Sequence, residues 1–348
     1  MNFLSSDKLF LRLAAVTLVV LYLVILAGAV VRATGSGMGC PDWPKCFGYY
    51  IPPTNPSQVE FHENHDYKKS QMIIVNDTLW RATSDFNSGT SFDHTKWEKY
   101  PVHNYAKFFV QQTWTEYVNR LVGATSGLCM SLLMFLALLR IKKDWKIFAV
   151  LVFGMCVLAF VIWLGKVIVD TNLKPFSITF HMMSALALVS VVIFTQTRVR
   201  FNGGLMKKLQ VTKKEKILLL IALLATLDQI FFGTQVRQQI DAINESMSGL
   251  SRELWIDQLE GVYKYHRTMA IGVVLLNVAL FYSLFRLKPS GTTKFLTFSL
   301  LFLMLAEYGV GVFMHDFSIP AYAQPVHLLL AMILFGIQFA LMVRTRSE

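Results

Sequence analysis

The sequence predicts an all-α membrane protein of eight transmembrane helices, arranged as two tandem four-helix bundles related by an internal repeat. The 348-residue chain is 54% hydrophobic and only 16% charged, whereas a soluble domain has about 25% charged residues. Eight apolar segments are each long enough to cross a bilayer, which takes about 20 residues. Matching motifs recur in the two halves at nearly equal spacing. These three observations together predict the fold class.

The eight segments are apolar over a full crossing and contain few charges. We place them at residues 11–32, 120–140, 147–168, 176–197, 216–236, 262–285, 294–314 and 324–343. Lys8 and Arg12 precede the apolar run of the first segment, as in a signal peptide. Its apolar run is long for a cleaved segment, and a related segment recurs in mid-chain. We therefore interpret it as a retained helix.

The net charge of +11 reflects the orientation of the chain in the membrane rather than a binding site for nucleic acid. Of the 33 lysines and arginines, 18 lie in the five segments on one side of the eight-span topology. Because basic residues concentrate in cytoplasmic loops, we expect a bacterial cell membrane protein with both termini cytoplasmic. The outward loop at 33–115 holds 7 basic and 8 acidic residues. No basic face remains for nucleic acid, so the expected surrounding partner is the lipid bilayer.

The matching motifs define the repeat. The pairs are Val31-Arg32 with Val236-Arg237, Asn119-Arg120 with His266-Arg267, and His181 with His327. The interval from Asn119 to His181 is 62 residues, and that from His266 to His327 is 61. The repeat predicts an N-terminal half at 1–200, which carries 58 extra residues in its outward loop, and a C-terminal half at 201–348.

Three histidines lie a few residues inside the outward ends of their spans: His181, His266 and His327. Ionisable groups inside a membrane are costly and are mostly functional or partnered. Two histidines that face each other across a bundle can hold a haem iron from both sides. The alternative is a hydrogen bond to a neighbouring helix. The echoed spacing of His266 and His327 favours iron ligation.

The first half differs from the second half at the positions expected to hold an iron. It offers His181 opposite Asn119, which is a poor iron ligand, so an iron held there would keep one side open. Glu116 lies three residues before Asn119 and shares its face if the helix begins that early. Two interpretations of Glu116 stay open. It either moves protons or stabilises charge beside the iron, or it pairs with Arg120 four residues later.

Four arginines occupy repeat-related positions at one level: Arg32, Arg120, Arg237 and Arg267. Arginine pairs with carboxylates through its planar fork, and haem carries two propionates. The alternative is that these side chains extend to the membrane interface. Their shared level favours a common anionic partner.

The outward loop is long, and a structureless loop of that length is unusual, so it is expected to fold as a small cap or to be partly mobile. Cys40 and Cys46 flank the segment CPDWPKC in this loop. An oxidising outer compartment allows them to form a disulfide. Their spacing leaves open whether that bond is structural or redox-active.

Five stretches together resemble the haem A synthase family. They are GAVVRATGSGMGCPDWPKC, EYVNRLVG, the span beginning near His181, YHR at 265–267 and QPVH at 324–327. The resemblance covers all eight spans. It implies a haem-dependent membrane oxidoreductase that oxidises a methyl group of haem O to the formyl group of haem A, for terminal oxidases. It also implies a b-type haem on His266 and His327.

The resemblance further implies that haem O binds the first half near Glu116 and His181, with a haem O synthase as the upstream partner. The outward cysteine pair is likewise a family feature. The family usually has histidine where this chain has Asn119, which leaves His181 as the expected iron ligand of the first half. The long outward insertion is atypical, and the electron donor is not identified by the sequence.

Two other functions remain open from the residues. One is a dihaem b-type electron-transfer subunit, which would need a quinone site and a redox partner. The other is a non-enzymatic haem carrier. Glu116 and the asymmetry of the two halves favour the enzyme, in which repeated hydroxylation of the methyl group and loss of water would give the aldehyde.

Overall fold

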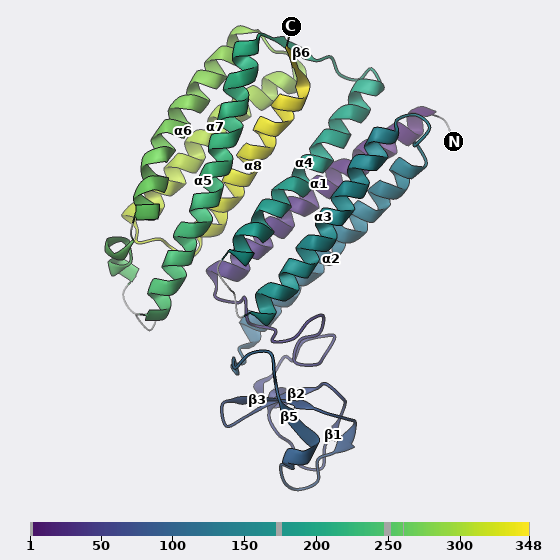
Figure 1. The fold of residues 1–348 in the computed structure, drawn as a ribbon, viewed down its shortest axis with the longest axis vertical. Helices are drawn as coiled ribbons and strands as arrows, with labels where there is room; N and C mark the ends of the chain where they lie inside the picture. The colour runs from purple at the N-terminus through teal and green to yellow at the C-terminus, as the bar shows by residue number, and fades with distance from the viewer. Residues whose placement is uncertain (1–2, 172–175, 247–251, 260, 348) are drawn as a thin grey trace.

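The computed structural model describes residues 3–171, 176–246, 252–259 and 261–347. Within these residues, eight helices are long and apolar enough to cross a membrane (Figure 1). They are α1 (Phe3–Ala33), α2 (Val110–Leu138), α3 (Trp145–Asp170), α4 (Ser177–Asn202), α5 (Lys213–Ser246), α6 (Gly261–Arg286), α7 (Gly291–Asp316) and α8 (Ala323–Arg344). The predicted fold class, an all-α protein with eight spans, is confirmed.

Two helices extend beyond their apolar runs on the outward side. Helix α2 begins at Val110 rather than near residue 120, and its early residues Thr113 and Glu116 are buried under the outward loop. Helix α5 ends at Ser246 rather than near residue 236, because Ile240 packs into a second apolar cluster with Trp255. An apolar run measures the length in contact with lipid, whereas contacts with the protein extend a helix further.

The helices form two neighbouring groups, α1–α4 and α5–α8 (Figure 1). Helices α1 and α4 contact α8, and α4 also contacts α5, so the groups are packed together. The core of the first group includes Met130 and Val192, and that of the second includes Leu280 and Leu300. Met332 of α8 belongs to the first core. The division at residue 200 and the internal repeat remain predictions.

The loop between α1 and α2 folds as a small unit at one end of the helices (Figure 1). It contains an antiparallel sheet of β2 (Met72–Val75), β3 (Thr78–Ala82) and β5 (Trp97–Lys99), and a second pair of β1 (Asp66–Tyr67) and β4 (Phe86–Asn87). Asn76 and Asp77 have φ of 48° and 53°, which a two-residue hairpin between twisted strands requires. Of the two expectations for this loop, the structure shows the folded cap.

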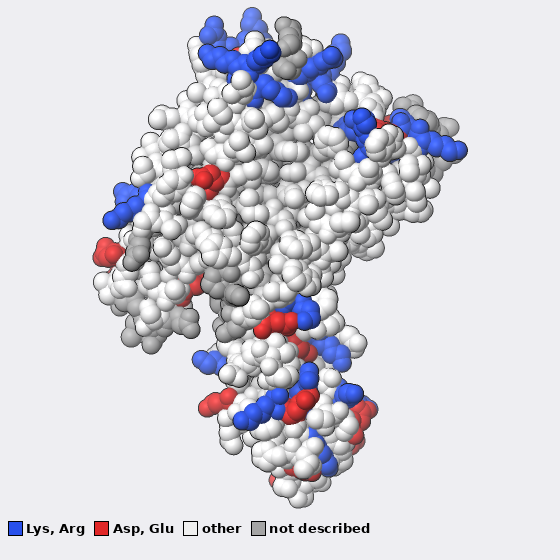
Figure 2. Space-filling model, viewed as in Figure 1, with Lys and Arg blue, Asp and Glu red and all other residues white. Residues whose placement is uncertain are grey.

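Short elements complete the chain. They are the 3₁₀ helices η1 (Pro56–Val59), η2 (His94–Lys96), η3 (Arg252–Leu254) and η4 (Ile256–Gln258), and the parallel strand pair β6 (Leu209–Val211) and β7 (Thr345–Ser347). Figure 2 shows lysines and arginines gathered at the end of the helices away from the cap, where both chain termini also lie in Figure 1. The orientation expected from the loop charges, with both termini cytoplasmic, stays a prediction.

Candidate functional site: paired histidines and a buried carboxylate

The second group of helices brings the rings of His266 and His327 close together. Helix α6 begins at Gly261 and α8 at Ala323, so both histidines lie in the second turn of their helices and at similar depth. Their ring centroids are 6.4 Å apart, with an angle of 84° between the ring planes. An iron between two imidazoles needs ring centres about 6 Å apart, because each metal–nitrogen bond is about 2 Å long. The observed spacing fits such an iron.

A glycine on the preceding helix faces each of four residues that the repeat matches, namely Asn119, His181, His266 and His327. A Cβ built at Gly233 would lie 3.3 Å from Cε1 of His266, and one at Gly311 would lie 3.3 Å from Cε1 of His327. The first half has the same arrangement with looser contacts, 3.8 Å from Gly165 to Cε1 of His181 and 3.8 Å from Gly28 to Oδ1 of Asn119. Larger side chains would fill the space beside the rings.

The three imidazoles present the same nitrogen to the protein. Nδ1 of each is buried without a well-formed hydrogen bond among the described residues. The rings approach the backbone of the preceding helix, His181 at Val161, His266 at Gln229 and His327 at Glu307. The half-buried rings are therefore left with Nε2 for a further ligand. This donor set, with its glycine cradle, fits a haem between His266 and His327.

Glu116 is buried at the outward end of α2 and joins this helix to the cap. Its Oε2 accepts a hydrogen bond of 2.8 Å from the backbone N–H of Cys40, and its Oε1 lies 2.5 Å from Nη2 of Arg120. Arg120 also donates to the carbonyl oxygens of Asp42 and Lys45, each at 2.9 Å. The ion pair expected as one interpretation of Glu116 is present on α2, and both of its members contact the cap loop.

The cap loop reaches α2 because of one glycine. A Cβ at Gly39 would lie 2.5 Å from the carbonyl oxygen of Gln112, so only glycine permits this approach. The next residue, Cys40, forms the expected disulfide with Cys46. Nearby, burial raises the pKa of Asp42, although its carboxylate accepts a hydrogen bond from the N–H of Gly48. The disulfide loop thus holds the amide that binds Glu116.

Two of the four matched arginines meet at the interface between the helix groups. Nη2 of Arg32 lies 2.9 Å from Oδ2 of Asp241, and Nη2 of Arg237 lies 2.7 Å from Oδ1 of the same carboxylate. Arg237 also donates to the side chain of Gln324. Arg267 is exposed at the start of α6. The four arginines therefore have different surroundings, and a carboxylate already bridges two of them.

Sequence reasoning missed Asp241, Glu307 and the four glycines. Glu307 lies on α7, and its Oε1 is 3.0 Å from Nδ1 of His327. The signal that could have found it is an acidic residue in the middle of an apolar span. The i, i+4 spacing of Arg237 and Asp241 could have indicated their pairing. The contact of Asp241 with Arg32 has no such signal, because it joins two helices that are far apart in the chain.

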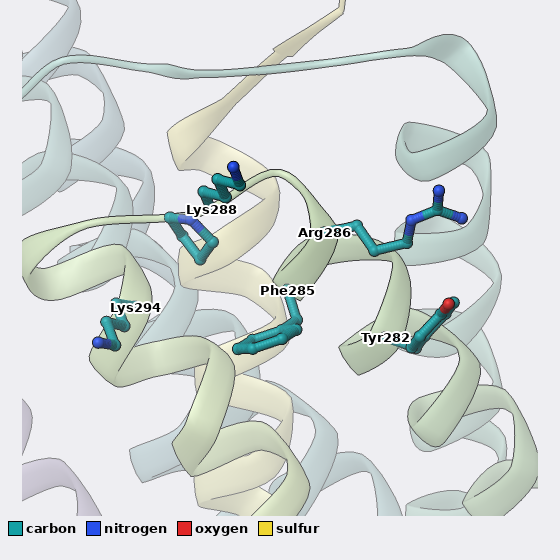
Figure 3. Close-up of a pocket in the computed structure, with 6 residues that line it drawn as sticks. Tyr282, Phe285, Arg286, Lys288 and Lys294 are labelled. Atoms are coloured by element: carbon teal, nitrogen blue, oxygen red, sulfur yellow. The ribbon is translucent and has the colours of Figure 1, made fainter.

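One cavity of about 510 Å³ lies at the other end of α6, lined by residues that include Tyr282, Phe285, Arg286 and Lys294 (Figure 3). The 20 residues from His266 to Arg286 correspond to about 30 Å along a helix axis. Figure 3 shows the side chains of Arg286 and Lys294 pointing to opposite sides. This cavity is therefore separate from the histidine site, and its charges do not converge on one ligand.

Comparison with known proteins identifies the family. Residues 11–86 and 90–339 match the family model described as cytochrome oxidase assembly protein. The chain belongs to this family. It is 23% identical to a heme A synthase of Shewanella oneidensis over 325 residues, which cover 86% of each chain.

Shorter similarities connect the chain to two further relatives. A heme A synthase of Bacillus pumilus is 44% identical over 48 residues, or 14% of this chain and 16% of the relative. A heme A synthase of Shouchella clausii is 35% identical over 72 residues, or 20% and 24%. The family match spans both helix groups and most of the cap, so all parts of the described site lie within it.

Proposed function

We propose that this chain is a haem A synthase, an enzyme that oxidises a methyl group of haem O to the formyl group of haem A. The observation that carries the proposal is the paired imidazoles of His266 and His327, 6.4 Å apart, in a chain of this family. The relatives named heme A synthase support it. A haem carrier would not need a buried carboxylate such as Glu116 in the half that is expected to bind haem O.

We propose that His266 and His327 hold a haem b through their Nε2 atoms, in the C-terminal half at 201–348. Bound there, haem b would supply one-electron transfer, which suits a six-coordinate iron. Arg237 lies in the same half and belongs to the arginine–carboxylate bridge at its outward end, so it is the favoured partner for a propionate. Arg32, across the interface, and the exposed Arg267 are further candidates.

Haem O would bind the N-terminal half at 1–200, as the substrate. Nε2 of His181 would hold its iron on one side, and Asn119 would leave the other side open. Glu116 would hold or release a proton at its carboxylate oxygens beside this open side, with Cys40 N–H and Arg120 fixing its orientation. Arg120 already donates to Glu116 and to the cap loop, so a propionate would have to share this guanidinium.

The orientation follows from the distribution of charge. The lysines and arginines at the end opposite the cap support a multi-pass protein of a bacterial cell membrane with both termini in the cytoplasm. The cap and the disulfide would then lie outside, in an oxidising compartment. A haem O synthase would supply the substrate within the bilayer, and a separate electron donor would reduce the protein.

The test is production of haem A in cells that make haem O but lack their own haem A synthase. The chain is expressed there, haems are extracted, and haem O and haem A are separated by chromatography. Haem A is expected with the natural sequence. Accumulation of haem O alone, from protein that purifies as a folded species, would refute the proposal.

Ligand variants separate the enzyme from a dihaem electron-transfer subunit. His266→Ala or His327→Ala is expected to remove the six-coordinate b-type spectrum. His181→Ala is expected to leave that spectrum and abolish haem A formation. A dihaem electron-transfer subunit would instead lose electron transfer in all three variants and produce no haem A with the natural sequence.

A further inference from the structure

Glu307 is a buried acid in the middle of α7 and approaches one of the two facing histidines. It is 9% exposed, and its Oε1 lies 3.0 Å from Nδ1 of His327. The other oxygen, Oε2, is buried and has no hydrogen-bond partner among the described residues. An acidic side chain within a membrane span is costly and is expected to have a function.

The position of Glu307 on its helix explains the approach. Gly311 lies one turn later on the same face of α7, and the ring of His327 lies over this glycine. The backbone at Glu307 also approaches this ring. The side chain of Glu307 therefore adds a carboxylate beside the nitrogen that faces away from the site.

The residue at the position that Glu307 occupies relative to Gly311 differs between the two halves. The residue four places before the glycine is Val24 before Gly28, Val161 before Gly165, Gln229 before Gly233 and Glu307 before Gly311. Both residues in the first half are apolar, and both in the second half are polar. His181, which approaches the backbone at Val161, thus has no carboxylate where His327 has one.

We propose that Glu307 is a positioning residue for His327: its carboxylate, 3.0 Å from Nδ1, takes up the Nδ1–H when Nε2 holds the haem b iron. This inference rests on the proposed function. A histidine that binds a metal commonly donates its other N–H to a carboxylate, which fixes the ring and makes it a stronger electron donor. A stronger donor stabilises the oxidised iron, so Glu307 lowers the reduction potential of haem b.

The asymmetry gives electron transfer a direction. The iron held by His181 lacks this carboxylate, so its potential is not lowered in the same way. Electrons would then pass from a haem held in the second half towards the substrate in the first half. In this view, the difference between Glu307 and Val161 sets the low-potential donor site apart from the site of oxidation.

The experiment measures the midpoint potential of haem b in the purified full-length protein. Expression in cells that lack haem O synthase loads the protein with haem b alone. Glu307→Val copies the residue at position 161, and Glu307→Gln keeps the shape and one acceptor oxygen. In Glu307→Val we expect the ratio of reduced to oxidised haem at a fixed potential to rise about tenfold, or about 59 mV for one electron.

Glu307→Gln is expected to shift the potential in the same direction by less, and it decides the question if Glu307→Val fails to fold. Glu215→Gln is the matched control, since Glu215 is another acid in this half and its carboxylate accepts hydrogen bonds from Thr212 and Ser283 rather than approaching a histidine. It should leave the potential nearly unchanged. An equal shift in this control, or an unchanged potential in the folded Glu307 variants, would overturn the inference.

The outcomes distinguish this inference from the proposed function. If the natural protein has no b-type haem that depends on His266 and His327, both are refuted. If it has that haem and its potential is independent of Glu307, only the positioning role is refuted. A purely structural role for Glu307 would change the melting temperature without moving the potential.

Discussion

Gly311→Ala tests whether the glycine cradle positions His327. The added Cβ would lie 3.3 Å from Cε1 of the imidazole, whereas carbon atoms prefer about 3.5–4.0 Å. The ring must therefore move by about 0.2–0.7 Å, and overpacking of this kind costs about 1–3 kcal/mol. Exchange of glycine for alanine inside a helix returns about 1 kcal/mol. The expected net effect on the free energy of unfolding is a loss of about 0–2 kcal/mol.

Gly309→Ala is the matched control on the same helix. A Cβ at Gly309 meets no described atom within 4 Å, so this variant is expected to gain about 1 kcal/mol from helix propensity alone. The two variants should thus differ by about 1–3 kcal/mol. Thermal unfolding in detergent measures the stability, and the haem b absorption band measures retention of the cofactor. Equal stability and equal haem content in the two variants would refute a steric role for Gly311.

Three further predictions concern charged residues. Glu116→Gln should retain haem and lose haem A formation by about 100-fold or more, measured by haem extraction, and full turnover would exclude a role in proton transfer. Asp241→Asn should lower the free energy of unfolding by about 1 kcal/mol, a modest loss because the carboxylate is partly exposed, and thermal unfolding would show it as a lower melting temperature. Replacing the exposed Asp257 by asparagine should leave the melting temperature unchanged. Burial tends to raise the pKa of Asp144, but hydrogen bonds from Arg198 and Asn202 more than offset this, so that its pKa is lowered. Its contribution is therefore present at neutral pH and lost as the pH falls below about 4, so Asp144→Ala should lower the melting temperature at pH 7 and match the natural protein at acidic pH.

The spans and the candidate ligands could be read from the sequence because their signals are local. A run of apolar residues such as 147–168 predicts a helix wherever its neighbours lie, because lipid imposes the same requirement on every crossing. The early start of α2 at Val110 was outside that signal. Its first turns contain polar residues, and they are buried by the cap rather than by lipid.

The partners of the arginines could not be predicted in the same way. Arg32 and Arg237 were matched by the repeat, but no local pattern places Asp241 within reach of Arg32. This contact forms where the end of α1 meets the last turns of α5 across the interface. Similarly, the approach of Cys40 N–H to Glu116 depends on a glycine that permits the cap loop to touch α2.

The sequence by itself determined the fold class, the eight spans and the residue types available for holding a haem. It did so because the length of each apolar run, the charge of each loop and the spacing of the histidines are local properties of the chain. Only the tertiary structure decided which further groups meet the histidines: the carboxylate of Glu307 at His327 and the glycine beside each ring. These contacts join different helices, so they are set by how the helices pack at one depth rather than by any local pattern.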